Sequence, residues 1–193
     1  MKNVILAMVV LSPLVASAQD MPLHTIIHPS AKWETWGATF PADDQKASFQ
    51  VSSVGKLMLN EKEVSPTVEN VAAISTWHRG GTLAVAFKNS KYVWAYRITK
   101  TGVDAGDTYV TLRVRPMEID AMVTAMCIDA TDRLYVACKS GIQIFDPTGR
   151  LCGVVTLPDN LPVSGIRITQ SKDGVYLYAQ GTSTVFRLPL LGK

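Results

Sequence analysis

The chain has 193 residues, of which 47% are hydrophobic, and a formal net charge of +3 at pH 7. This length suits one domain with a sizeable buried core. No run of Lys and Arg that could bind a phosphate backbone is present, so the sequence argues against a nucleic-acid partner. A nucleophile elbow, a Walker loop and a glycine-rich dinucleotide turn are also absent from the sequence.

Residues 1–18 predict a secretory signal peptide. Lys2 supplies a positive start, residues 4–15 are almost wholly apolar, and Ala16-Ser17-Ala18 provides the small residues that precede a cleavage site. A membrane anchor is the alternative, but a span needs roughly 20 apolar residues and Pro13 interrupts this one. We therefore expect cleavage after Ala18, a secreted or periplasmic protein, and no membrane attachment afterwards.

Residues 19–67 are the least regular part of the chain. Two strand-like runs, Ala47–Ser52 and Lys56–Leu59, occur there, but a whole blade cannot be assigned, and we interpret the segment as a β segment that could complete a blade. His24 and His28 lie between prolines in a segment that reads as extended, where they would share one face of a strand. They are candidate metal ligands, although exposed or edge-strand histidines fit the same pattern.

Residues 68–193 predict an all-β fold. Short β-branched and aromatic runs alternate with turns rich in Gly, Asp, Asn and Pro, which is typical of antiparallel strands. The clearest stretch predicts a four-stranded up-and-down sheet with tight turns. Its strands are Ala125–Asp129, Leu134–Cys138, Gly141–Phe145 and Leu151–Leu157.

The same plan occurs before and after this sheet. The second strands align as LAVAF, LYVAC and VYLYA, beginning at Leu83, Leu134 and Val175, a spacing that fits propeller blades. We predict blades of four antiparallel strands in a partial or reduced β-propeller of three to four blades. The last blade lacks a strand, which His24–His28 or Trp33–Phe40 could supply. The other predicted strands are Val71–Ser75, Leu83–Phe87, Tyr92–Ile98, Tyr109–Val114, Gly165–Thr169, Val175–Ala179 and Thr184–Leu188.

The three cysteines, Cys127, Cys138 and Cys152, are odd in number despite the oxidising destination that we expect. If residues 130–133 form a hairpin turn, Cys127 falls opposite Val136 and the Cys127 and Cys138 sulfurs are offset rather than paired. We interpret all three as small buried hydrophobic residues. Their spacing matches no standard metal site.

Two runs carry a family resemblance. GGTLAVAFKNSKYVWAYRI, which begins at Gly80, and AMCIDATDRLYVACKSGIQIFDPTGRL, which begins at Ala125, resemble the second half of the gluconolactonase/regucalcin family, as does the closing run Leu161–Leu190. The resemblance implies a β-propeller, six-bladed in the family, that hydrolyses sugar lactones and related esters. It also implies a divalent cation in the central channel, held by a Glu, two Asn and an Asp. Calcium is the first expectation, with zinc or magnesium possible.

Two of the family's four ligand positions fall within the matched region, each in the loop that leads into the innermost strand of a blade. Asn70 matches one of the asparagines and is our candidate metal ligand, whereas Thr124 stands where the family has its aspartate. Asp120 could replace that carboxylate only if the loop were rearranged. No Glu-Gly-Pro run supplies the glutamate. The chain is also short for six blades, so a trimmed propeller, a half-propeller that pairs with another chain and a truncated gene product all remain open.

Two functions follow from these observations. The first is an exported gluconolactonase-like propeller whose metal-dependent hydrolysis of a small sugar lactone is impaired. The second is a non-catalytic binding or assembly module that keeps only the scaffold. Trp77-His78-Arg79 is interpreted as a packing or partner-contact loop, because it lies at the end of its blade opposite the channel mouth.

We also predict that the protein self-associates. An arc of three or four blades leaves the faces and edges of its end blades uncovered, and exposed strand edges invite pairing. Light scattering on the cleaved protein at micromolar concentration should therefore give a mass above that of one chain. A monomer mass would contradict this prediction.

Overall fold

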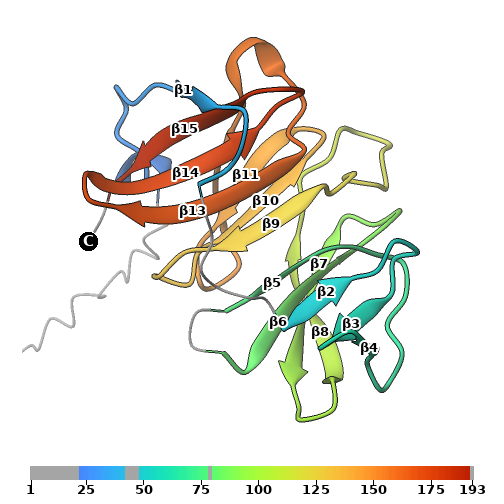
Figure 1. Cartoon of the computed structure of the whole chain (residues 1–193). Helices are drawn as coiled ribbons and strands as arrows, with labels where there is room; N and C mark the ends of the chain where they lie inside the picture. The colour runs from blue at the N-terminus through green and yellow to red at the C-terminus, as the bar shows by residue number, and fades with distance from the viewer. Residues whose placement is uncertain (1–21, 42–47, 78–79, 192–193) are drawn as a thin grey trace, which may run out of the picture.

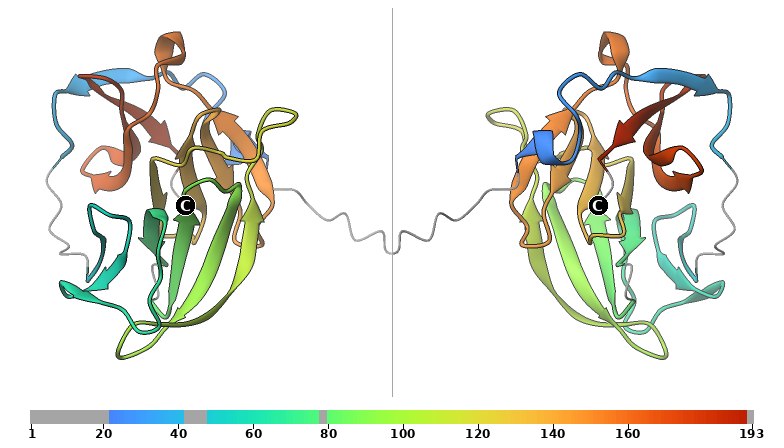
Figure 2. Two further views of the ribbon diagram at one scale, coloured as in Figure 1. Left: turned by 90° about the vertical axis from the view of Figure 1, so that its right-hand side faces the viewer. Right: turned by 90° about the vertical axis from the view of Figure 1, so that its left-hand side faces the viewer.

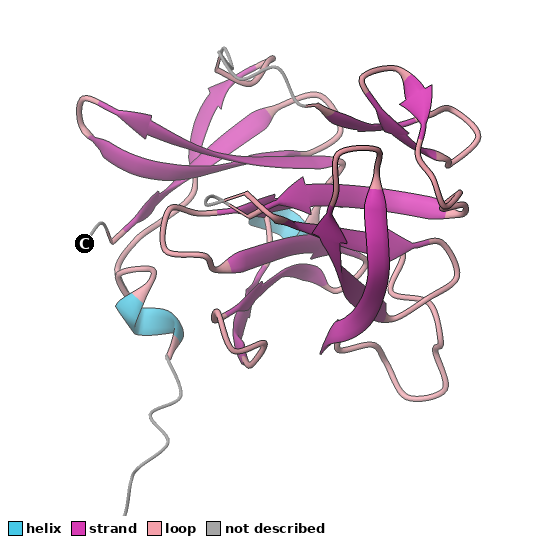
Figure 3. Ribbon diagram, turned by 90° about the horizontal axis from the view of Figure 1, so that it is seen from below, coloured by secondary structure: helices cyan, strands magenta, loops and turns pink. Residues whose placement is uncertain are grey.

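The computed structural model describes residues 22–41, 48–77 and 80–191, and it confirms the all-β prediction. Four small antiparallel sheets form a four-blade propeller arrangement (Figure 1). Within the described residues the only helices are two three-residue 3-10 turns (Figure 3). None of them could span a membrane. The predicted signal peptide lies outside the described residues.

The four blades follow one another along the chain, except that the outermost strand of blade 4 comes from the N-terminal part. Apart from that strand, the first strand of each blade lies innermost. Blade 1 consists of β2 (Phe49–Val51), β3 (Leu57–Leu59) and β4 (Lys62–Glu63). Blade 2 consists of β5 (Val71–Thr76), β6 (Thr82–Phe87), β7 (Tyr92–Ile98) and β8 (Val103–Thr111). Blade 3 consists of β9 (Ala125–Ile128), β10 (Leu134–Cys138), β11 (Gly141–Phe145) and β12 (Leu151–Val155). Blade 4 consists of β13 (Gly165–Ser171), β14 (Gly174–Gln180), β15 (Val185–Leu190) and β1 (Glu34–Gly37), and the 3-10 turns are η1 (Leu23–Thr25) and η2 (Pro158–Asn160).

Blade 4 is completed by a strand from the N-terminal part of the chain, which confirms one of the two expectations. The strand is β1, from within Trp33–Phe40, and it pairs antiparallel with β15. The Arg187 side chain fixes this pairing, because its Nε lies 2.8 Å from Glu34 Oε2 and its guanidinium lies 5.0 Å from the Trp36 ring centroid. The antiparallel backbone pairing with β15 and this cross-strand side-chain pair both hold β1 in register.

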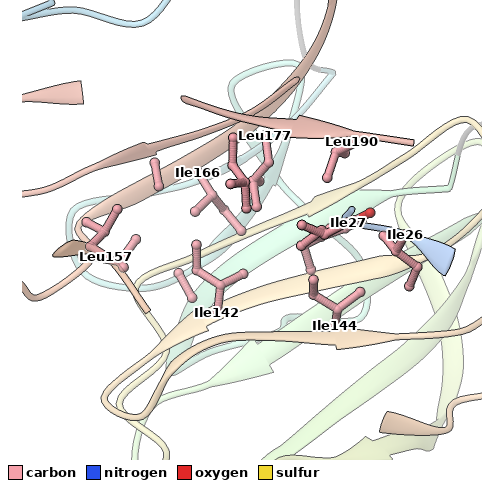
Figure 4. Close-up of a cluster of buried hydrophobic side chains, with 13 residues drawn as sticks. Ile26, Ile27, Ile142, Ile144, Leu157, Ile166, Leu177 and Leu190 are labelled. Carbon is pink, nitrogen blue, oxygen red and sulfur yellow. The ribbon is translucent and has the colours of Figure 1, made fainter. Parts of the chain in front are cut away.

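The other expectation, a strand at His24–His28, is wrong. The Leu23–Thr25 segment forms η1, and the chain that follows packs its apolar side chains between blades 3 and 4 (Figure 4). Ile26 is fully buried there, and its carbonyl accepts a hydrogen bond from Leu191 N at 2.8 Å. Burial of these apolar side chains, rather than strand pairing, determines the conformation of this segment.

One strand of blade 2 was predicted in the wrong place. The sequence suggested Tyr109–Val114, but β8 runs over Val103–Thr111. A tight turn, in which Thr99 N donates to Gly102 O at 2.9 Å, starts β8 earlier, in a polar stretch that lacks strand-like alternation. In that stretch Gly106 lies under the Tyr96 ring, where a Cβ would meet the ring at 2.8 Å. Residues 112–124 therefore form a loop between blades 2 and 3.

The predicted cross-strand partner of Cys127 was wrong by one residue. Cys127 lies opposite Tyr135 rather than Val136, because the turn closes on the Leu134–Ile128 pair. All three cysteines are free, and Cys138 is buried. Desolvation, with the nearby Asp129 charge, raises the pKa of the Cys127 thiol well above its ordinary range. This thiol is therefore not an activated nucleophile at neutral pH.

Three clusters of buried apolar residues join neighbouring blades: blade 1 to blade 2, blade 2 to blade 3, and blade 3 to blade 4. Within the described residues no fourth cluster joins blade 4 to blade 1, although Figure 2 shows both on the same side of the molecule. Blade 4 instead receives Phe40 and Pro41 from the segment after β1. Arg167 on β13 donates to the Pro41 carbonyl at 2.7 Å and lies 5.3 Å from the Phe40 ring centroid.

Candidate functional site

The loops that lead into β5, β9 and β13 lie at one end of the propeller, because these three innermost strands run in the same sense in successive blades. This end carries Asn70 immediately before β5 and Thr124 immediately before β9. Both predicted positions therefore occupy the expected place in their blades. Their side chains, however, differ in what they contact.

Asn70 has a left-handed backbone, with φ +58°, and an exposed side chain. Its carbonyl accepts a hydrogen bond from Lys88 N at 2.7 Å, which ties the loop to the turn between β6 and β7. Asn is one of the few residues with a side chain that adopts this backbone conformation readily. The backbone geometry is thus a sufficient reason for Asn at this position, independent of any metal.

Thr124 is already engaged by the protein. Its Oγ1 donates to the Val163 carbonyl at 2.7 Å, and its backbone N donates to the Ala137 carbonyl at 3.0 Å. The hydroxyl hydrogen bond joins blade 3 to the chain that leads into blade 4. A threonine in this position therefore stabilises the contact between two blades, which a carboxylate could not do because it has no proton to donate.

Asp120 does not replace the missing carboxylate. Its Oδ1 accepts a hydrogen bond from Met122 N at 2.8 Å and so stabilises the loop in which it lies. Among the described residues, no three or more His, Cys, Asp or Glu side chains are grouped so that they could hold a metal ion. His28 Nδ1 instead lies 2.6 Å from Ser30 Oγ. The donor set at this end does not fit the family's calcium site, because a divalent cation needs carboxylate charge to offset its dehydration.

A pocket of about 510 Å³ opens beside Thr124. It is formed by three segments of the same end: the loop from 112 to 124, the turn between β10 and β11, and the connection from β12 to β13 that contains η2. Arg115, Lys139 and Ser140 give it polar groups, while Met122 and Leu161 give it apolar ones. This pocket could not be predicted from the sequence, because its walls come from loops that are far apart along the chain.

The charge at the pocket is positive. Lys139 Nζ lies 2.7 Å from Glu118 Oε1, and both side chains are partly exposed. The hydrogen bond from Lys139, with the charges of Lys139 and Arg115, holds the pKa of the Glu118 carboxyl below its ordinary value. Glu118 is therefore ionised at neutral pH, and two cationic side chains share one carboxylate.

The wall of the pocket is held by Gln143, a fully buried amide on β11. Its Oε1 accepts from Arg113 N at 2.8 Å and its Nε2 donates to Arg113 O at 2.7 Å, as a neighbouring strand would. Nε2 also lies 3.0 Å from Ser140 Oγ. A polar residue in the middle of an apolar strand was the only sequence signal of this arrangement. The Gln143 amide attaches the loop that follows blade 2 to a strand of blade 3, and this attachment holds the backbone of Arg115 near the pocket.

Comparison with solved structures places the fold among known propellers. A gluconolactonase from Xanthomonas campestris superposes with a TM-score of 0.55 at 17% identity, over 70% of this chain and 44% of that protein. Regucalcin from Agrobacterium tumefaciens, described as a calcium-binding protein, gives a TM-score of 0.51 at 9% identity, over 72% of this chain and 53% of that one. BBS1N, solved in complex with ARL6DN, gives 0.50 at 18% identity, over 75% of this chain and 46% of that one.

The chain thus spans about half the length of these proteins and shares the gluconolactonase/regucalcin-like propeller fold, as the sequence resemblance predicted. No protein-family model matches the sequence. No curated protein matches it either. A fold shared with an enzyme and with a protein solved bound to a partner does not decide the function, so the function must be argued from the site.

Proposed function

We propose that this chain is an exported gluconolactonase/regucalcin-like propeller in which metal-dependent lactone hydrolysis is impaired, and that it acts as a binding module. The observation that carries the proposal is Thr124, which stands in the place of a carboxylate and donates its hydroxyl proton to the Val163 carbonyl at 2.7 Å. A lactone hydrolase of this kind uses the cation to polarise the carbonyl and to activate water. Without carboxylate charge, the cation is held poorly.

The ion that this end would take is a divalent cation, calcium first and zinc or magnesium next, with Asn70 as the retained ligand. Binding is expected to be weak because Asn70 and Thr124 are both neutral. Export rests on residues 1–18 of the sequence. Self-association is part of the same proposal. Its support is that, among the described residues, apolar clusters join blades 1 to 2, 2 to 3 and 3 to 4, whereas no such cluster covers the outer faces of blades 1 and 4.

We expect wild-type protein to bind calcium, magnesium and zinc only weakly, with little thermal stabilisation, and to hydrolyse simple lactones slowly or not at all. Thr124→Asp should gain calcium binding, because it supplies a carboxylate next to two backbone carbonyl oxygens. Isothermal titration calorimetry of both proteins measures the difference. Asn70→Gly, which keeps the left-handed backbone, should remove the gain if Asn70 is a ligand.

The outcomes separate the two candidate functions. Tight calcium binding by the wild type that survives Asn70→Gly would place the ion elsewhere and overturn the assignment of both positions. Rapid lactone turnover by the wild type would overturn the proposed function itself. Absence of binding even in Thr124→Asp would contradict the expected gain: the missing blades, and not the missing carboxylate, would then have disabled the site, and a scaffold without a metal centre would be favoured over an impaired hydrolase.

A further inference from the structure

The pocket beside Thr124 is lined by a cationic and an apolar group of side chains, besides the neutral polar Ser140, Thr156 and Asn160. Arg115 and Lys139 line it with positive charge, and Met122, Leu161 and Val163 line it with apolar surface. None of its lining residues is an aspartate or a glutamate. Such a combination suits a ligand that has an anionic group at one end and a hydrocarbon body at the other.

The positive side retains charge after its internal pairing. Glu118 Oε1 accepts a hydrogen bond from Lys139 Nζ at 2.7 Å, and the carboxylate also lies near the Arg115 charge. One carboxylate cannot neutralise two cations. The pairing also positions the Lys139 side chain at the pocket rim. An incoming carboxylate would therefore find one donor held in place, the Lys139 ammonium, and a second, the exposed Arg115 guanidinium, which can bind it through two hydrogen bonds.

The apolar side continues out to the surface. In the loop between blades 2 and 3, Met117 is 99% exposed, Ile119 is 74% exposed and Met122 is 56% exposed. Of these three side chains Met122 lines the pocket, and exposed apolar side chains at such a place are typical of ligand sites. The loop is anchored despite this exposure, because Ala121 is buried and its carbonyl accepts from Lys139 N at 3.1 Å.

We propose that this pocket binds a small amphipathic organic acid, with its carboxylate at Arg115 and Lys139 and its hydrocarbon body against Met122 and Leu161. The proposal rests on the binding function proposed above and names the ligand class of that module. A sugar acid is the competing ligand: Ser140, Thr156 and Asn160 could bind some of its hydroxyl groups, but the others would lose water against Met122, Leu161 and Val163.

Three six-carbon probes test both halves of the proposal: hexanoate, its neutral isostere hexanamide, and the polyhydroxy acid gluconate. Calorimetry on the signal-cleaved protein, with EDTA present, should show hexanoate binding at least about tenfold more tightly than either of the others. Equal binding of hexanamide would overturn the role of the two cations. Equal or tighter binding of gluconate would overturn the role of the apolar side, and absence of hexanoate binding up to about 10 mM would overturn the proposal.

Matched variants localise the effect. Arg115→Gln and Lys139→Gln should each weaken hexanoate binding by roughly tenfold. Arg97→Gln removes the same charge from an exposed ion pair with Asp104 on blade 2, away from the pocket, and should leave the affinity unchanged. An equal loss in Arg97→Gln would mean that net charge rather than the pocket attracts the acid. Because EDTA excludes metal, failure here is separate from the metal and lactone experiments, which alone test the loss of hydrolysis.

Discussion

Replacing Asp129 by Ala should lower the free energy of unfolding by about 3–5 kcal/mol, because it leaves a buried arginine without its carboxylate. The side chains of Asp129 and Arg133 are 5% and 7% exposed, and Arg133 Nε lies 2.6 Å from Asp129 Oδ2. The same oxygen accepts from the Tyr135 hydroxyl at 3.1 Å. The other oxygen, Oδ1, accepts from the backbone N of Thr131 at 2.8 Å and of Arg133 at 3.0 Å, so one residue closes the turn between β9 and β10.

A second turn in the same blade provides the control. Asp146 forms the same pattern between β11 and β12, with Oδ1 accepting from Thr148 N at 2.8 Å and from Arg150 N at 3.0 Å. Arg150, unlike Arg133, has an exposed side chain. Asp146→Ala should therefore cost less, about 1–2 kcal/mol, because it strands no buried charge.

Urea unfolding followed by tryptophan fluorescence measures both losses. The double variant Asp129→Ala/Arg133→Met should recover part of the stability, because it removes the unpaired charge together with its partner. Equal losses at the two turns, or no recovery in the double variant, would show that the turn hydrogen bonds rather than the buried ion pair dominate.

Blades 2 to 4 could be predicted because their pattern is local, whereas the short strands of blade 1, β2 to β4, were not recognised as a blade. Each strand of blade 3 was placed from alternating apolar runs between turns such as Asp146-Pro147-Thr148-Gly149, and the structure has all four. The missing strand of blade 4 was predicted from topology, because an incomplete last blade needs a partner from elsewhere. The start of β8 could not be predicted, because its polar residues are held by pairing with β7 rather than by their own strand preference.

The candidate site could be predicted only in part. Asn70 and Thr124 lie in the loops that the resemblance indicated, because a loop before a strand keeps its place when the strand does. Whether a side chain is available as a ligand depends on contacts that are remote in sequence, such as the one from Thr124 to Val163. The pocket depends on three separate loops and on Gln143, so no single stretch of sequence indicates it.

The last prediction concerns the turn that forms one side of the pocket. Gly141 has φ +112°, and a Cβ there would lie 2.7 Å from the Val155 carbonyl oxygen. That oxygen belongs to the strand that pairs with β11, so it cannot move without disturbing the Ile142–Val155 pair. Gly141→Ala should therefore cost about 1–2 kcal/mol for the backbone conformation and about 1–3 kcal/mol more for the clash.

Gly174 is the matched control, because it also follows a two-residue turn and begins a strand with positive φ, at +139°. The nearest atom to its Cβ, on Tyr176, would be 3.9 Å away, so Gly174→Ala carries only the backbone cost. Thermal unfolding should show the larger drop for Gly141→Ala, with each 1 kcal/mol lowering the Tm by about 2–4 °C. An equal decrease in Tm for the two variants would mean that β12 moves to accommodate the added methyl group without a measurable cost. The turn between β10 and β11, which forms part of the pocket, would then be less rigid than the close approach of Gly141 to the Val155 carbonyl indicates.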